Sequence, residues 1–209
     1  MLDPIVRTRR LQHDFDAMTR LRGSVIDFEV DSVSAPERYE VQFHLRSLIG
    51  VVNGAPIYTE PGHVHRIEIR LPSSYPQRLS NEDVTFVSTP IFHPNVFTDG
   101  RVCIRDYKPS ESLDRFVLRV AKYIQCDPAY TGLDSLANQA TVDFFRANPA
   151  LFPVDRTVLP GLAEAASRRF HVSDDGGAPK KRFVVVADPV VPARRMFKVA
   201  SSGSSGGSR

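Results

Sequence analysis

The chain has 209 residues, of which 42% are hydrophobic and 24% charged, and its net charge is +3. This length suits one medium domain with a tail, and the composition is ordinary for a soluble globular protein. The small net charge, the absence of Trp and the lack of a basic stripe interleaved with aromatics argue against nucleic-acid binding. No stretch approaches the roughly 18 apolar residues of a membrane span, so we expect no membrane partner.

Cysteine usage and the first residues indicate the compartment. Only two cysteines occur, Cys103 and Cys126, whereas disulfide scaffolds use many more. The opening residues Met1-Leu2-Asp3-Pro4 contain no apolar region of a secretory signal. We therefore expect a cytoplasmic protein in a reducing compartment, where a free thiol persists.

The first half of the chain predicts one helix followed by a sheet. Asp3-Pro4 is typical of an N-cap and first helical position, and Leu11, Phe15 and Met18 recur at helical spacings. Alternating apolar and polar residues predict strands over 39–46 and 66–71, and two more strands are placed at 25–30 and 84–88. Asn53-Gly54 marks a turn. Four strands joined by turns predict an antiparallel meander.

The second half predicts helices. An amphipathic helix over about 113–125 is ended by Asp127-Pro128, and a second begins near Ser135, with Leu136, Ala140 and Phe144 on one face. A short helix at 160–170, a linker at 174–179, a strand or partner-binding segment at 183–187 and a Gly/Ser-rich end at 201–209 follow. The sequence thus predicts an α+β domain over 1–170 and a basic tail over 171–209.

Between the last strand and the first of these helices, a side-chain amide precedes a thiol by eight residues. Pro94 fixes φ just before Asn95, and the turn Thr98-Asp99-Gly100, whose glycine supplies a positive φ, folds Asn95 back towards Cys103. A thiol with a nearby amide donor is a minimal acyl-transfer site, because sulfur is the nucleophile and the amide hydrogen-bonds the oxyanion.

These residues carry a family resemblance. His93-Pro94-Asn95 followed by Gly100-x-x-Cys103 resembles the active-site signature of ubiquitin-conjugating enzymes, and the stretch ending in Tyr75-Pro76 is similar to that family's strand-to-loop motif. With the helices downstream, the resemblance covers about the first three quarters of the chain. It implies the ubiquitin-conjugating-enzyme fold: an N-terminal helix, a four-stranded antiparallel meander, the active-site loop and C-terminal helices.

The resemblance also implies a reaction and its partners. A ubiquitin-like modifier would arrive as a thioester on an activating enzyme, pass to Cys103, and then pass to a lysine amine of a protein target. The chain itself needs no cofactor, because ATP is used by the activating enzyme. His93 is implied to be structural, together with Pro94 and Gly100.

Asp134 and two arginines are further candidates from the resemblance. Asp134 is implied to orient and help deprotonate the incoming lysine amine, while its alternative role is a helix cap. Arg9 and Arg10 are implied to dock on the activating enzyme, and the alternative is a solvated helix face. Arg101 and Arg105 flank Cys103, where positive charge would stabilise a thiolate.

Other reactive side chains receive plainer interpretations. Cys126 is expected to be buried and inert. His63 and His65 are two residues apart on a strand, and without a third ligand we interpret them as surface or edge histidines rather than a metal site.

Departures from the family pattern suggest a divergent member. The thiol is followed by Ile104-Arg105-Asp106-Tyr107 instead of the usual Leu-Asp-Ile-Leu, and the 77–83 loop lacks the Phe and Pro that commonly meet ring-type ligases. We expect a bacterial-type enzyme, such as those encoded beside ubiquitin-like proteins in antiphage operons. Two alternatives remain: a non-catalytic ubiquitin-binding variant, which would lack the cysteine, and a thiol redox enzyme, which would have a second cysteine nearby.

Overall fold

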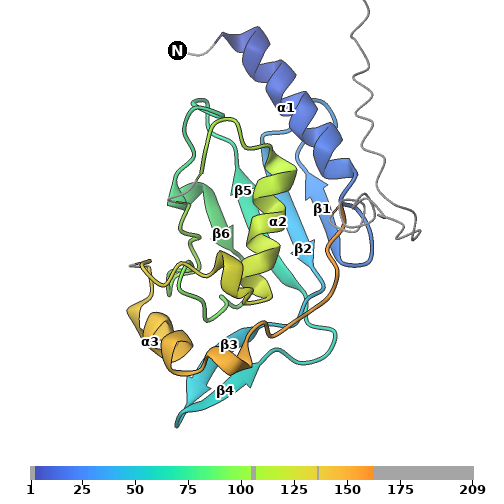
Figure 1. The fold of residues 1–209 in the computed structure, drawn as a ribbon. Helices are drawn as coiled ribbons and strands as arrows, with labels where there is room; N and C mark the ends of the chain where they lie inside the picture. Colours follow the sequence, from blue (N-terminus) through green and yellow to red (C-terminus); the bar gives the residue numbers. More distant parts are fainter. Residues whose placement is uncertain (1–2, 105–106, 136, 162–209) are drawn as a thin grey trace, which may run out of the picture. The chain divides into compact units, whose positions relative to one another are not determined.

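The computed structural model describes residues 3–104, 107–135 and 137–161, shown as the coloured ribbon in Figure 1. Several predictions concern residues outside this description: Arg105, Leu136, most of the helix at 160–170, the linker, the segment at 183–187 and the Gly/Ser-rich end. The division into a domain over 1–170 and a tail stays a prediction.

One helix precedes a four-stranded antiparallel sheet, as predicted. Helix α1 spans Pro4–Thr19, and the strands are β1 (Ile26–Val30), β2 (Arg38–Phe43), β5 (His65–Arg70) and β6 (Val84–Phe86), in the spatial order β1-β2-β5-β6. Inward-facing residues alternate along these strands and bury one face against the helices. The predicted meander is therefore confirmed.

A small hairpin is inserted between β2 and β5. Strands β3 (Leu48–Val52) and β4 (Ala55–Tyr58) pair antiparallel across Asn53-Gly54, both of which have positive φ. The turn was predicted but its strands were not, because their residues show no alternation of apolar and polar side chains. The backbone N–H of Phe92 donates to the Leu48 carbonyl at 2.8 Å, so the hairpin supports the loop that carries the candidate site.

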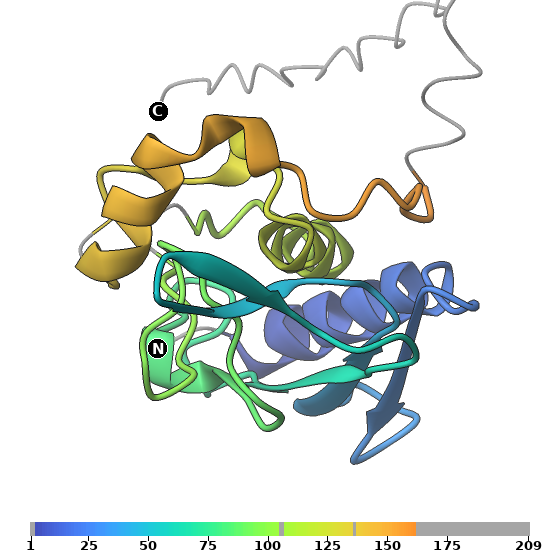
Figure 2. The same cartoon turned by 90° about the horizontal axis from the view of Figure 1, so that it is seen from below.

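The remaining helices follow the loop that carries the candidate site. Helix α2 (Leu113–Ile124) lies over one face of the sheet with α1 beside it, and α3 (Gln139–Ala147) follows (Figures 1 and 2). Short 3-10 helices occupy Asn81–Asp83, Pro128–Tyr130 and Pro149–Leu151. The start of α2 was predicted well.

The start of α3 was predicted about four residues too early. Ala140 is exposed, and the buried face consists instead of Thr141, Val142 and Phe145. The reason is that the residues before Gln139 form a loop whose backbone contacts the active-site loop, and Asn138 has extended dihedral angles.

A buried carboxylate joins α1 to α2. Asp14 is fully buried and accepts hydrogen bonds from Arg10 Nε (2.7 Å), Tyr75 Oη (2.5 Å) and the Leu113 N–H (3.2 Å). Asp14, which is far from Leu113 in the sequence, therefore accepts a hydrogen bond from an N–H at the start of α2 that has no acceptor within its own helix. The Arg10 guanidinium also donates to two backbone carbonyls of the 109–111 loop, which fixes the segment between the active-site loop and α2.

The apolar side chains form two clusters. The larger lies between the sheet, α1 and α2. The smaller is centred on Leu48, Cys126 and Phe145, and the aromatic rings around it come from the hairpin, the active-site loop, α3 and the segment after α3: Tyr58, Phe92, Phe144 and Phe152. The second cluster thus supports the candidate site from the sides of the hairpin and α3.

Candidate active site

The loop between β6 and α2 brings the backbones of Asn95 and Cys103 together. The Cys103 N–H donates to the Asn95 carbonyl at 2.8 Å, and Val96 pairs with Val102 in an antiparallel bridge. Gly100 closes the turn with φ +90°, and a Cβ on it would lie 3.0 Å from the Phe86 carbonyl oxygen. Glycine is therefore required at this position both by its dihedral angle and by the close backbone.

His93 holds the backbone of this loop from within the core. Its Nδ1 accepts the Asn95 N–H at 3.0 Å, its Nε2 lies 3.4 Å from Thr131 Oγ1, and its ring stacks on Tyr123. Burial lowers the pKa of His93 to about 3, so the imidazole is neutral near pH 7 and carries its proton on Nε2. A fully buried histidine with so low a pKa is a poor base for Cys103.

Asn95 is 7% exposed, and its carboxamide is held in one orientation. Its Oδ1 accepts the Gly132 N–H at 3.0 Å, which leaves Nδ2 as the donor of the group. A Cβ on Gly132 would lie 3.2 Å from Asn95 Nδ2 and 3.5 Å from an Asp134 carboxylate oxygen. The Asn95 carboxamide and the exposed Asp134 carboxylate therefore both face the bare Cα of Gly132 and lie near one another.

The two thiols lie in opposite environments. Cys103 is a partly exposed free cysteine. Cys126 is fully buried in the second cluster, and burial raises the pKa of its thiol to about 12. Since the thiolate is the nucleophile, Cys103 is the thiol that can react.

The site lies within the part of the chain that matches a known family. The model of the ubiquitin-conjugating enzyme family matches residues 10–146, from α1 to the last turn of α3. The chain belongs to the ubiquitin-conjugating enzyme family. Members typically carry a catalytic cysteine and work with a ubiquitin-like modifier and an activating enzyme. A search of curated proteins found no match to the chain.

The arginines predicted to act in this conjugating-enzyme domain differ in exposure and in the groups that they contact. Arg101 pairs with Asp99 at 2.8 Å and with Glu82 at 3.8 Å, and these carboxylates offset the charge proposed to favour the Cys103 thiolate. Arg9 on α1 is exposed. Arg10 is committed to Asp14 and the 109–111 loop, so docking through it would require breaking those contacts.

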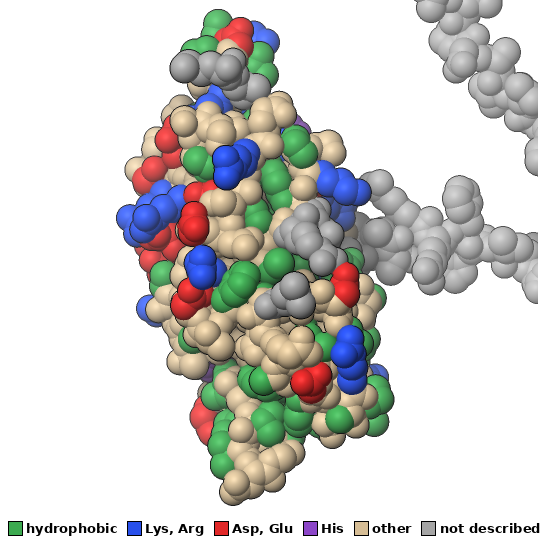
Figure 3. Space-filling view, turned by 90° about the vertical axis from the view of Figure 1, so that its left-hand side faces the viewer, with side chains coloured by type: hydrophobic (Ala, Val, Ile, Leu, Met, Phe, Trp, Pro, Cys, Tyr) green, Lys and Arg blue, Asp and Glu red, His purple; other side chains and the backbone are tan. Residues whose placement is uncertain are grey.

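The surface of this domain shows no field of one charge in the view of Figure 3, where basic and acidic side chains are interspersed. None of the described helices has the length and apolarity needed to cross a membrane.

The histidine pair at the start of β5 corrects a prediction. His65 is fully buried rather than at the surface or an edge, and burial lowers its pKa to about 4. Its ring packs against His63 and Phe86, with centroids 4.6 Å and 6.3 Å away. Neither ring nitrogen of His65 has a hydrogen-bond partner among the described residues, which also contain no group of three ligating side chains for a metal.

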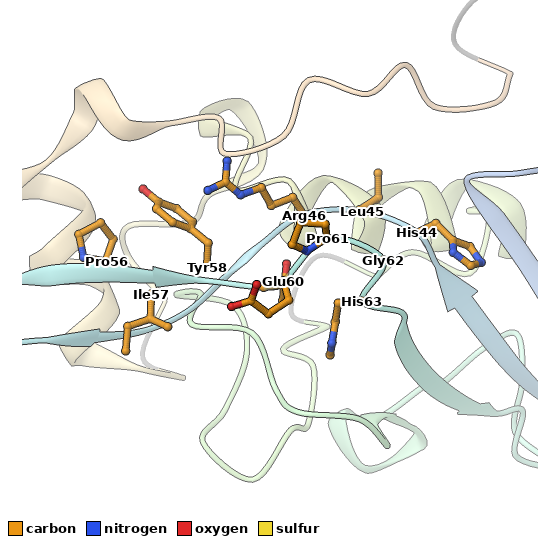
Figure 4. Close-up of a pocket in the computed structure, with 11 residues that line it drawn as sticks. His44, Leu45, Arg46, Pro56, Ile57, Tyr58, Glu60, Pro61, Gly62 and His63 are labelled. Atoms are coloured by element: carbon orange, nitrogen blue, oxygen red, sulfur yellow. The ribbon is translucent and has the colours of Figure 1, made fainter.

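A cavity of about 660 Å³ is lined by His63, and its walls are the segment that follows β2, strand β4 and the segment before β5 (Figure 4). Arg46 stacks over the Tyr58 ring at 4.4 Å on its wall. Neither Cys103 nor Asn95 lines it, so the cavity is separate from the candidate site.

Two residues around the candidate site, Thr131 and Gly132, were not predicted from the sequence, since a Thr-Gly pair in a loop indicates only a turn.

Proposed function

We propose that this protein is an active ubiquitin-conjugating enzyme that carries a ubiquitin-like modifier as a thioester on Cys103 and transfers it to a lysine amine. One observation supports this most: an accessible thiol is paired through the backbone with Asn95, whose carboxamide is already oriented by Gly132. Such a pre-oriented donor stabilises a developing oxyanion without reorganising during the reaction.

The first step exchanges one thioester for another. The Cys103 thiolate attacks the C-terminal carbonyl carbon of the modifier, which is bound to a sulfur of the activating enzyme. A new C–S bond forms to Cys103, the old C–S bond breaks, and the sulfur of the activating enzyme leaves as a thiolate. Cys103 is the acceptor, because Cys126 is buried and its thiol keeps its proton.

The second step forms the isopeptide bond. A neutral lysine amine attacks the same carbonyl carbon, and Asn95 Nδ2 donates to the oxyanion. The C–N bond forms, the C–S bond breaks, and Cys103 leaves as a thiolate. The proton of the amine passes to Asp134, whose carboxylate is exposed next to Gly132 and close to Asn95.

His93 protects the intermediate by taking no part in proton transfer. A basic imidazole at the thioester would activate water and hydrolyse it. Burial keeps His93 neutral and weakly basic, and its ring nitrogens face the loop backbone and Thr131. The site thus differs from that of a cysteine protease in a way that favours amine over water.

The proposed setting is argued by analogy. The residues after Cys103 and the 77–83 loop depart from the usual family pattern, and we propose on this ground a divergent, bacterial-type enzyme. By analogy with enzymes encoded beside ubiquitin-like proteins in antiphage operons, its proposed place is the cytoplasm and its proposed role is antiphage defence. Arg9 on the exposed side of α1 is the proposed contact for the activating enzyme. Plaque counts on cells carrying the gene and its neighbours, with Cys103 intact or replaced by Ala, test the defence role separately.

The activity is tested with ubiquitin, its activating enzyme and ATP on non-reducing gels. We expect a ubiquitin adduct on the wild type that dithiothreitol removes. In Cys103→Ser the adduct becomes an ester that resists dithiothreitol, and in Cys126→Ala it stays as in the wild type. Non-covalent ubiquitin binding without any adduct would instead favour the binding module of the same fold.

A further inference from the structure

We propose that Gly132 is a positioning residue for Asn95: its N–H and its lack of a side chain together hold the carboxamide where it can serve the oxyanion. This inference rests on the proposed function and adds a residue to its second step. Gly132 follows α2 by eight residues and precedes α3, outside the loop that contains the sequence motif.

The contact between Gly132 and Asn95 has two parts. The Gly132 N–H donates to Asn95 Oδ1 at 3.0 Å. At the same time, the bare Cα faces the carboxamide, and an added Cβ would lie 3.2 Å from Nδ2 and 3.4 Å from Oδ1. Carbon does not pack this closely without displacement, so a side chain at this position would push the amide away.

The requirement for glycine here is steric rather than conformational. Gly54, Gly62, Gly100 and Gly161 have positive φ, whereas Gly132 does not. An alanine at 132 would therefore not have to adopt the left-handed region, and the effect of the substitution would come from the contact of its methyl group with its neighbours, of which the Asn95 carboxamide is the nearest.

The loop around Gly132 is anchored, so the carboxamide and not the loop would have to move. Thr131 Oγ1 donates to the Asp127 carbonyl at 3.0 Å, and Arg146 donates to the Leu133 carbonyl at 2.9 Å. The Ser135 N–H donates to the Gly132 carbonyl at 2.9 Å. Asn95 is nearly buried, so a shift of a few tenths of an ångström rotates Nδ2 away from the oxyanion position.

The consequence is confined to amine transfer. Thioester formation on Cys103 requires an accessible thiolate, which the substitution leaves in place. Loss of the whole oxyanion donor costs about 10²–10³-fold in rate. Because Gly132→Ala displaces the donor without removing it, we expect transfer to lysine to slow by about tenfold.

The experiment is single-turnover discharge of ubiquitin from Cys103 to free lysine. Gly132→Ala is compared with the wild type and with Gly23→Ala, a matched control, because Gly23 has no positive φ and nothing within 4 Å of its Cβ position. We expect normal charging in all three, discharge about tenfold slower in Gly132→Ala at saturating lysine, and the wild-type rate in Gly23→Ala.

A double variant separates positioning from a general structural effect. If Gly132 acts through the carboxamide, Gly132→Ala causes no further slowing in an Asn95→Ala background, where the methyl group has room. Equal slowing in both backgrounds would overturn the proposal, as would normal discharge in Gly132→Ala. If Gly132→Ala does not fold, folding regained in the double variant supports the contact, and continued failure refutes it.

Failure of the proposed function gives a different result. If the wild type forms no thioester on Cys103, the conjugating activity itself is wrong and the positioning role is lost with it. Normal charging combined with an unchanged discharge rate in Gly132→Ala overturns the positioning role alone.

Discussion

The active-site loop and the start of β5 each hold a fully buried, neutral histidine, and the two histidines differ in their hydrogen bonding. Both nitrogens of His93 have polar neighbours, the Asn95 N–H and Thr131 Oγ1. His65 has none among the described residues and contacts His63 and Phe86 through its ring. A buried polar group without a partner costs free energy, so the ring nitrogens of His65 destabilise the fold and its ring contributes only packing. His93, by contrast, holds the backbone of the active-site loop through the hydrogen bond from the Asn95 N–H.

The largest effect that distinguishes the two regions is on catalysis. Asn95→Ala removes the donor that His93 and Gly132 hold in place, and we expect lysine discharge about 10²–10³-fold slower with the Cys103 thioester still formed. His65→Phe should discharge at the wild-type rate, because His65 lies on β5 outside the site. Single-turnover discharge measures both, and a wild-type rate in Asn95→Ala would remove it from the mechanism.

The next effect is on stability. His93→Phe keeps the stacking on Tyr123 but leaves the buried Asn95 N–H without its acceptor, which should lower the free energy of unfolding by about 1–3 kcal/mol. His65→Phe removes two unpartnered nitrogens at similar volume, so we expect unchanged or higher stability. Urea denaturation of the two variants decides this. A larger loss for His65→Phe would mean that His65 has polar partners of its own.

The sequence predicted the loop far better than the start of β5. His93-Pro94-Asn95, Gly100 and Cys103 lie within eleven residues of each other, so local turn chemistry sufficed to bring the backbones of Asn95 and Cys103 together. Gly132 is distant in sequence and its role is set by packing, which no local pattern encodes.

His65 was mispredicted although a signal existed. The alternation of Ile67 and Ile69 on the inner face of β5, extended back by two residues, places His65 on that face too. The start of α3 and the β3–β4 hairpin were missed for a different reason. Contacts with the active-site loop, through Gly132 and Leu48, determine these segments more than their own periodicity does.

A third effect appears on acidification. Burial lowers the folded-state pKa of His65 to about 4 and of His93 to about 3, below the ordinary value of 6.5. Below about pH 6.5 the unfolded chain therefore binds protons that the folded chain does not. The stability that these neutral histidines carry is complete above pH 6.5 and falls as the pH decreases towards 4.

The slope of this loss distinguishes the two histidines. Each contributes up to about 1.4 kcal/mol per pH unit between pH 6 and 4.5, so the wild type should lose up to about 2.8 kcal/mol per unit from the pair. Urea denaturation across this range should show His65→Phe with a shallower slope by about half of that amount. Parallel slopes for wild type and variant would mean that His65 titrates normally in the folded protein.

The smallest effect comes from making His93 resemble His65. Thr131→Val removes the hydroxyl that lies 3.4 Å from His93 Nε2 and donates to the Asp127 carbonyl, while keeping the side-chain volume. We expect a loss of about 1 kcal/mol in the free energy of unfolding and a discharge rate within a few-fold of the wild type. Thr131→Ser, which keeps the hydroxyl, is the matched control. Discharge as slow in Thr131→Val as in Asn95→Ala would show that the Nε2 contact, and not the Asn95 N–H bond to Nδ1, controls the loop.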